Sequence, residues 1–384
     1  MLVERMKGFE TTVFSEMTAL ARATGAVNLG QGFPDADGPD WLLEAAVSAV
    51  RGHDHNQYPP GRGVRELRAA VAEHQRRWYG LDVDPDTEVL VTCGATEAIA
   101  ATVLALCEPG DEVVTLEPYY DSYAASIALA GAVRRPVPFA QPGFRLDGDA
   151  LAAAFSDRTR MVLLNSPHNP TGRVLDRSEL ETVARLAEQH DALVVTDEVY
   201  EHLVFDGLEH VPMATLPGMA ERTLTISSAG KTFAVTGWKV GWLHGPAELV
   251  SAVTAVKQFL TFVSSGPFQP AVATALAAPD DFFAAQATDL ARRRDLLCEG
   301  LRDVGFGVAV PQGGYFVLAD AAPLGFDDGL DLCRRLPELA GVVGVPVQAF
   351  VDDVAPVRSL VRFAFCKQDD VLAEGVRRLK RLRG

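Results

Sequence analysis

Short apolar runs alternate with longer segments of helical periodicity between residues 40 and 275. Five of these runs predict β-strands, at Glu88–Cys93, Glu112–Leu116, Arg160–Leu164, Ala192–Thr196 and Thr223–Ser227. They are rich in Val, Leu and Ile, which is typical of strands that are buried on both faces. The segments between them predict helices such as Glu97–Leu106 and Ser178–His190, with Ser178 as the N-cap of the second. The alternation predicts an α/β fold with a mostly parallel central sheet flanked by helices.

The pattern changes after the segment PDD at residues 279–281. A long charged helix is predicted around Ala291–Val304, followed by short apolar runs and a final helix at Asp369–Lys380. We therefore predict a large domain at residues 41–280 and a smaller α/β domain at residues 281–384. Residues 1–40 are expected to form an N-terminal segment that joins the small domain.

The composition excludes several classes of function. The chain has 384 residues, of which 48% are hydrophobic, and a formal net charge of −16. Nucleic-acid binding requires a basic surface, so this charge argues against a nucleic-acid partner. The five cysteines are scattered without a Cys-x-x-Cys pair, which is typical of a reducing compartment and predicts no metal site. Without an apolar signal core, or an apolar run near the roughly 20 residues of a membrane helix, we expect a cytoplasmic protein with no membrane partner.

Polar residues follow three of the predicted strands, at the edge where open α/β sheets bind ligands. The segment GAT at residues 94–96 opens a helix, and residues this small let a phosphate approach backbone N–H groups. An ordinary strand–helix turn is the alternative. The segment NSPHNP at residues 165–170 is a stiff loop suited to presenting an amide to a ligand. Asp197 directly follows a buried strand, and capping of a following helix is the alternative for this residue.

Two lysines lie in the segment SSAGKTFAVTGWKVGW at residues 227–242, among neighbours too small for a charged surface helix. An enclosed lysine is costly unless it is paired or its charge is removed. Lys231 can form a Schiff base with an aldehyde, and Lys239 can face a phosphate dianion. Asp197 can pair with a ring nitrogen, while Asn169 and Tyr200 can reach a phenolate oxygen. Together these residues supply what a phosphorylated aldehyde cofactor requires.

Nearly the whole chain carries, in order, the motifs NLGQGFPD, NQYPPGRG, GATEA, EPYYDSY, NSPHNPTG, TDEVYEHLVFD, SSAGKTFAVTGWKVGW and LVRFAF. In this combination it resembles the class I (fold type I) pyridoxal-phosphate aminotransferases. The nearest resemblance is to the kynurenine aminotransferase and glutamine transaminase K branch. Within that branch it is most similar to the actinobacterial N-succinyldiaminopimelate aminotransferases.

The resemblance implies a role for each candidate residue around the cofactor. Lys231 would hold pyridoxal phosphate covalently and shuttle protons, Asp197 would pair with the pyridine nitrogen, and Tyr200 would reach the phenolate oxygen together with Asn169. Tyr120 would stack on the ring. The implied phosphate ligands are Ala95, Thr96, Ser228 and Lys239.

The same resemblance implies how substrate and a second subunit meet the cofactor. Arg362 would clamp the substrate α-carboxylate through a bidentate pair. Gly32 and Phe14 match positions that line the substrate pocket, and family members often carry Trp where this chain has Phe14. Tyr58 would reach the phosphate of the neighbouring subunit, which implies a homodimer. We interpret Phe350 as a packing residue.

The expected reaction moves an amino group from an amino acid to a 2-oxo acid, 2-oxoglutarate, by a ping-pong cycle. The donor stays open between the kynurenine, glutamine or methionine type and a succinylated diaminopimelate, for which Arg62, Arg173 or His168 are candidate partners. Two other functions are considered. One is a pyridoxal-phosphate-dependent lyase that expels a leaving group from cysteine S-conjugates. The other is a non-catalytic regulator that retains the fold, which the acidic charge disfavours.

Overall fold

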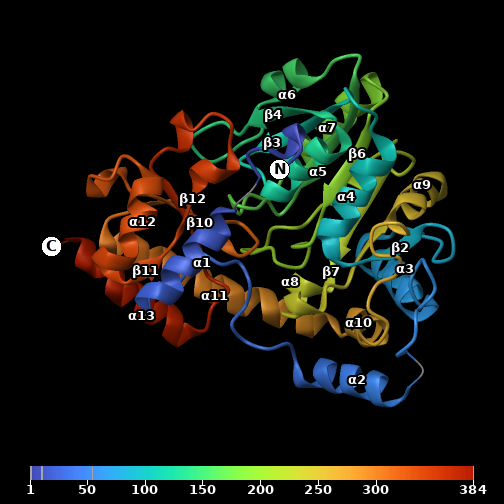
Figure 1. Cartoon of the computed structure of the whole chain (residues 1–384), viewed down its shortest axis with the longest axis horizontal. Helices are drawn as coiled ribbons and strands as arrows, with labels where there is room; N and C mark the ends of the chain where they lie inside the picture. Colours follow the sequence, from blue (N-terminus) through green and yellow to red (C-terminus); the bar gives the residue numbers. More distant parts are fainter. Residues whose placement is uncertain (1, 10–11, 54, 384) are drawn as a thin grey trace.

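A seven-stranded sheet forms the centre of the larger part of the molecule (Figure 1). The structure is a computed structural model that describes residues 2–9, 12–53 and 55–383. The strand order is β2-β8-β7-β6-β5-β3-β4. Neighbouring strands are parallel except at β8, which runs antiparallel to β2 and β7. The strands span β2 (Val89–Thr92), β3 (Glu112–Glu117), β4 (Val133–Pro138), β5 (Thr159–Asn165), β6 (Leu193–Asp197), β7 (Thr223–Ser228) and β8 (Gly241–His244).

The five predicted strands are confirmed as β2, β3, β5, β6 and β7, to within one residue at either end. The sequence did not predict β4 or β8. β4 lies at the edge of the sheet and reads VRRPVP, so it lacks the apolar run of a strand buried on both faces. β8 is only four residues long, and it begins at Gly241, two residues after Lys239, near the end of the lysine-containing segment.

Helices cover both faces of this sheet, as predicted. Side chains of α4, α5 and α9 pack on one face, and those of α6 and α7 pack on the other. The helices of the larger part are α2 (Asp40–Arg51), α3 (Arg65–Tyr79), α4 (Gly94–Leu106), α5 (Asp121–Ala130), α6 (Gly148–Ala154), α7 (Arg177–Gln189), α8 (Ala229–Thr232), α9 (Ala247–Lys257) and α10 (Phe268–Leu276).

The predicted N-cap of α7, Ser178, lies two residues after the observed N-cap, Asp176. Asp176 is the N-cap, because its carboxylate accepts a hydrogen bond from the Glu179 backbone N–H, and the Glu179 carboxylate accepts one from the Asp176 N–H in return. Ser178, the predicted cap, lies inside the first turn and donates its hydroxyl to Asp176. α4 begins at Gly94, three residues before the predicted helical stretch Glu97–Leu106, and this start agrees with the prediction that residues 94–96 open the helix.

The smaller part, orange and red in Figure 1, contains a four-stranded antiparallel sheet in the order β12-β13-β10-β9. The N-terminal segment joins it, since β1 pairs with β11 in parallel and α1 packs against α12. Its elements are α1 (Val13–Thr24), β1 (Val27–Asn28), β9 (Gly307–Val308), β10 (Phe316–Asp320), α12 (Gly329–Ala340), β11 (Val342–Val343), β12 (Val345–Pro346), β13 (Leu360–Ala364) and α13 (Asp369–Leu379).

The long helix α11 (Asp280–Val304) connects the two parts and begins eleven residues before the predicted Ala291. Near its start Phe283 packs with side chains of α3 and α10, whereas Leu297 and Leu301 pack with the small sheet. The helix therefore begins at the predicted domain limit, although its first turn still packs with the larger part, and the domain limits themselves stay a prediction. Among the helices of the described residues, none has the length and apolar content that spanning a membrane requires.

Candidate active site

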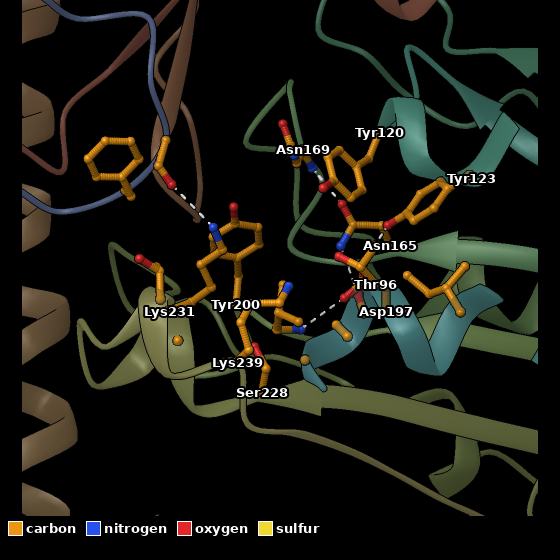
Figure 2. A pocket seen from close by; sticks show the side chains of 18 of the residues that line it. Thr96, Tyr120, Tyr123, Asn165, Asn169, Asp197, Tyr200, Ser228, Lys231 and Lys239 are labelled. Atoms are coloured by element: carbon orange, nitrogen blue, oxygen red, sulfur yellow. Dashed lines mark hydrogen bonds between the residues drawn. The ribbon is translucent and has the colours of Figure 1, made fainter. Parts of the chain in front are cut away.

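A cavity of about 310 Å³ lies at the carboxyl ends of β5, β6 and β7. These strands end at Asn165, Asp197 and Ser228, and all three residues line the cavity (Figure 2). Phe316 and Arg362 of the small sheet form another wall. The predicted site residues found in the lining are Phe14, Gly32, Ala95, Thr96, Tyr120, Asn169, Asp197, Tyr200, Ser228, Lys231, Lys239 and Arg362.

Asp197 presents a buried carboxyl group to this cavity. One oxygen accepts a hydrogen bond from the Tyr123 hydroxyl at 2.6 Å, and the other accepts from the Val199 N–H at 3.3 Å. Burial raises the pKa of Asp197 to about 6, although the Tyr123 hydrogen bond opposes the shift. A turn rather than a helix follows Asp197, so the alternative of a helix cap is wrong.

Lys231 lies in the short helix α8, directly after β7, and its amine is enclosed. The Nζ atom donates to the Gly32 carbonyl at 3.1 Å, and it lies 5.8 Å from the ring centre of Tyr200 and 5.7 Å from that of Tyr315. The Tyr315 hydroxyl donates to the Lys231 carbonyl and fixes the backbone there. Burial lowers the pKa of the amine, which makes the neutral, nucleophilic form more accessible.

The N-terminus of α4 faces the Lys239 ammonium group across a gap that only glycine permits. Gly94 has a φ of +76°, and a Cβ there would lie 3.0 Å from the Lys239 Nζ. Lys239 itself adopts a left-handed conformation, with φ of 53°. Unpaired N–H groups of a helix N-terminus attract anions, and the ammonium adds a full charge. With Thr96 and Ser228 at the same place, the arrangement suits a phosphate.

Asn165 organises the loop that carries Asn169. Its side-chain N–H donates to the Asp197 carbonyl at 2.8 Å, and its side-chain oxygen accepts from the Asn169 N–H at 2.6 Å. The Asn169 side chain accepts a hydrogen bond from Arg362 at 3.1 Å. The loop after β5 is thereby tied both to the end of β6 and to the small sheet.

Within the described chain, the Arg362 guanidinium forms hydrogen bonds but no ion pair with a carboxylate. Its Nη1 donates to Asn169, its Nη2 donates to the Gly30 carbonyl at 3.1 Å, and its Nε has no hydrogen-bond partner among the described residues. The guanidinium lies 3.9 Å from the ring centre of Phe316, and 5.0 Å from those of Phe14 and Phe350. Burial lowers the pKa of Arg362 to about 10, so the group stays charged at neutral pH. This geometry can receive an anionic ligand.

The sequence missed several side chains that shape the site. Phe350, predicted to be a packing residue, is buried and also lies beside Arg362. Phe316 could not be identified from the residues around it in the sequence, because Arg362, which it contacts in space, is distant in the chain. Tyr123 could have been found, because it stands three residues after Tyr120 and therefore shares a helix face with it.

Four predicted candidates lie elsewhere. Tyr58 is 81% exposed, contacts Phe262 edge to face, and lines a separate cleft formed by residues 55–59, 261 and 263–267. Arg173 is paired with Glu179 at 2.9 Å, while His168 is buried, with its pKa lowered to about 3, and is therefore neutral. Arg62 donates to a backbone carbonyl outside the cavity. Within one subunit, none of these last three lines the described part of the cavity.

The donor set fits pyridoxal phosphate. The cavity holds one enclosed amine for an aldehyde, one buried carboxyl group for a ring nitrogen, and a helix N-terminus with an ammonium group for a phosphate. The close approach of Lys239 to Gly94, which a Cβ would disturb, is a cradle of the kind that phosphate binding needs.

The comparisons with known proteins agree with this geometry. The family model "Aminotransferase class I and II" matches residues 24–379. The chain is 54% identical to the probable N-succinyldiaminopimelate aminotransferase DapC of Mycobacterium tuberculosis, covering 99% of this chain and 98% of that protein. It is 38% identical to methionine aminotransferase of Escherichia coli, covering 97% and 96%.

A solved structure, that of N-succinyldiaminopimelate aminotransferase from Mycobacterium tuberculosis, superimposes with a TM-score of 0.98 over 100% of both chains at 54% identity. Fold, cavity chemistry and relatives thus agree on the class of enzyme. The chain belongs to the class I and II aminotransferases, and it is a pyridoxal-phosphate-dependent transaminase of fold type I.

Proposed function

We propose that this aminotransferase takes N-succinyldiaminopimelate as its amino donor and 2-oxoglutarate as its acceptor, in a ping-pong cycle. The observation that supports the donor most strongly is the 54% identity to DapC over the full length of both chains. The observation that supports the cycle is that the described lining of this cavity contains one arginine, Arg362. Because donor and acceptor each carry a carboxylate next to the reacting carbon, they would use this arginine in turn.

Pyridoxal phosphate, when bound, supplies an aldehyde and a ring that withdraws electrons from the substrate. Lys231 would then serve twice, as the amine that holds the group and as the base that moves a proton at the substrate α-carbon. Its lowered pKa favours both tasks, because a neutral amine is nucleophilic and can accept a proton. The Gly32 carbonyl, which accepts its hydrogen bond, orients the Nζ atom.

Asp197 and Tyr200 would bind two different edges of the cofactor ring. A carboxylate in a site of low dielectric constant binds a protonated ring nitrogen strongly, and Tyr123 holds one Asp197 oxygen in place for this task. The Tyr200 phenol stays protonated, because burial raises its pKa well above the usual value, so it can donate a hydrogen bond to an anionic oxygen. Asn169 would donate to the same oxygen.

We also propose that the enzyme works as a homodimer in which Tyr58 of the partner subunit completes the phosphate site. Tyr58, Phe259 and Phe262 are 81%, 84% and 54% exposed, an apolar surface that a second copy would cover.

Two variants that are each expected to be inactive test this by complementation. Lys231→Ala and Tyr58→Ala subunits, refolded together, should regain activity, because one site of each mixed dimer keeps both residues. Failure to regain activity in verified mixed dimers would contradict the shared site.

A donor screen tests the proposed substrate. Purified holoenzyme is assayed with 2-oxoglutarate and, in turn, N-succinyldiaminopimelate, kynurenine, glutamine and methionine. We expect the highest kcat/KM for N-succinyldiaminopimelate, with glutamate formed in equal amount to donor consumed. A higher kcat/KM for another donor would overturn the substrate assignment. Pyruvate release from a cysteine S-conjugate faster than amino transfer would instead support the lyase.

A further inference from the structure

The turn after β6 presents its side chains to two opposite sides. Asp197, Val199 and Tyr200 line the cavity, whereas Glu198 and Glu201 point away from it and are buried. These two acidic groups have no role in the proposed reaction. Buried carboxyl groups are costly unless they are hydrogen-bonded, so their partners indicate what they do for the fold.

Glu201 connects two elements that carry the site. One of its oxygens accepts a hydrogen bond from the Ser227 hydroxyl at 2.8 Å, and the other accepts from the Tyr79 hydroxyl of α3, also at 2.8 Å. Ser227 is buried in β7, one residue before Ser228 and four before Lys231. Burial raises the pKa of Glu201 to about 7, which shows how far the group is removed from water.

The link from Glu201 to Ser227 continues where the backbone pairing stops. β6 and β7 pair in parallel up to Asp197, which lies opposite Ile226, and the Glu198 N–H donates to the Ile226 carbonyl at 2.8 Å. Beyond that point the chain of β6 turns away. Beyond the last backbone hydrogen bond, the Glu201 side chain therefore provides the connection between the turn and the end of β7.

The same region contains a group of side chains of the kind that hold metal ions: His74, Glu201 and His202 have ligand atoms within 4.8 Å of one another. The Nε2 atoms of the two histidines are 2.7 Å apart, which is a hydrogen-bond distance, and both Glu201 oxygens accept from hydroxyl groups. These atoms partner one another or their neighbours, so we interpret the cluster as a hydrogen-bond network.

We propose that Glu201 is a positioning residue, whose carboxyl group ties the turn that presents Asp197 and Tyr200 to the strand that presents Lys231. The inference rests on the roles proposed above for those three residues. Without the tie, the turn and the strand end can shift relative to each other, while the groups that contact cofactor and substrate all remain. Loss of a supporting hydrogen bond of this kind typically costs about 10- to 100-fold in activity.

The test compares Glu201→Ala, Glu201→Gln and a control, Glu112→Ala, in the holoenzyme. Glu112 also has a side chain with little exposed surface and is hydrogen-bonded, there by Ser156 and by partly exposed arginines, but it lies at the amino end of β3, away from the cavity. We expect Glu201→Ala to lower kcat about 10- to 100-fold with KM nearly unchanged, and to alter the visible spectrum of the bound cofactor. Glutamine keeps one oxygen that accepts a hydrogen bond, and its amide N–H can donate to a hydroxyl oxygen. Glu201→Gln should therefore keep most of the wild-type kcat. Glu112→Ala should lower Tm but leave kcat and the spectrum unchanged.

A kcat within about twofold of wild type for Glu201→Ala would overturn the inference, as would an equal loss of kcat in Glu112→Ala at a matched fall in Tm. If Glu201→Ala does not fold, Ser227→Ala and Tyr79→Phe each remove one donor to Glu201. Ser227→Ala should lower kcat with cofactor bound, and wild-type kcat in both variants would likewise overturn the inference. Transamination by the wild-type enzyme is measured first, so that failure of the proposed function is seen separately.

Discussion

Replacing Arg362 by lysine separates substrate binding from cofactor chemistry. Arg362 is 1% exposed, and its recorded contacts in the described chain are the Asn169 side chain, the Gly30 carbonyl and three aromatic rings. A substrate carboxylate would therefore be its ionic partner. A guanidinium binds a carboxylate through two parallel charge-assisted bonds, whereas lysine offers one point charge.

The magnitude follows from this geometry. Losing a charge-assisted pair in an enclosed site costs about 2–5 kcal/mol, which corresponds to roughly a 30- to several-thousand-fold fall in kcat/KM. The fall should be similar for every amino donor, because all of them share the α-carboxylate. The Lys231–cofactor spectrum should stay unchanged, since Arg362 lies on the small sheet and is not a predicted cofactor ligand.

The assay measures kcat/KM for aromatic, neutral and acidic donors with the wild-type enzyme, Arg362→Lys and a control, Arg358→Lys. Arg358 precedes the same strand but is largely exposed, and its ion pair with Asp328 should contribute little. A fall restricted to dicarboxylic donors would mean that Arg362 selects the side chain, and the proposed substrate orientation would then be reversed. An unchanged kcat/KM for all donors would remove its role altogether.

Three further predictions concern the cofactor side of the site. Burial raises the pKa of Asp197 from 3.8 to about 6, so the folded apoenzyme binds a proton that the unfolded chain releases, and its stability falls by about 3 kcal/mol as pH rises from 4 to above 6. Asp197→Asn lacks this loss of stability, so the difference between its Tm and that of the wild-type apoenzyme should rise over that pH range and then level off. Its turnover should become very slow. A Tm difference that does not depend on pH would refute the reasoning. Tyr123→Phe removes the hydrogen bond that lowers the pKa of Asp197, so the loss of stability should extend to higher pH and kcat should fall about tenfold, and an unaltered pH–Tm curve would argue against it. Gly94→Ala strains a left-handed backbone by about 1–2 kcal/mol and crowds Lys239, so cofactor Kd should rise about tenfold or more, whereas Gly148→Ala, whose Cβ meets only an ordinary contact at 3.6 Å, should bind normally. Equal cofactor affinity in the two glycine variants would show that the cradle is not where phosphate binds.

The sequence predicted five of the seven strands of the central sheet, because these five are contiguous apolar runs that end in polar residues. Asn165, Asp197 and Ser228 stand at the ends of adjacent strands, so a parallel arrangement alone brings them together. Lys231 follows within three residues of Ser228 and was placed by the same reasoning. The local sequence pattern therefore predicted most of the residues on the cofactor side of the cavity.

The remainder depends on contacts between distant segments, which local pattern does not encode. Gly32 approaches Phe316 so closely that a Cβ would lie 2.1 Å from its ring, and Arg362 lies over that ring. This contact is one of those that join the N-terminal segment to the small sheet, and the local sequence predicted the association but not the contact between these two residues. The hydrogen bonds of Glu201 to α3 and β7 are likewise tertiary. The proposed role of Tyr58 in a partner's site would depend on a second chain.

Chemical trapping tests the central claim, that Lys231 is the amine that binds the cofactor. Purified holoenzyme is treated with borohydride, digested, and mapped by mass spectrometry. Lys231 lies in the cavity with a lowered pKa, so the reduced cofactor should be found on its peptide, and the visible absorption band should disappear. Lys239 and Lys257 are the internal controls, since one faces the proposed phosphate site and the other is buried elsewhere. Label on either of these lysines, or none on Lys231, would contradict the account.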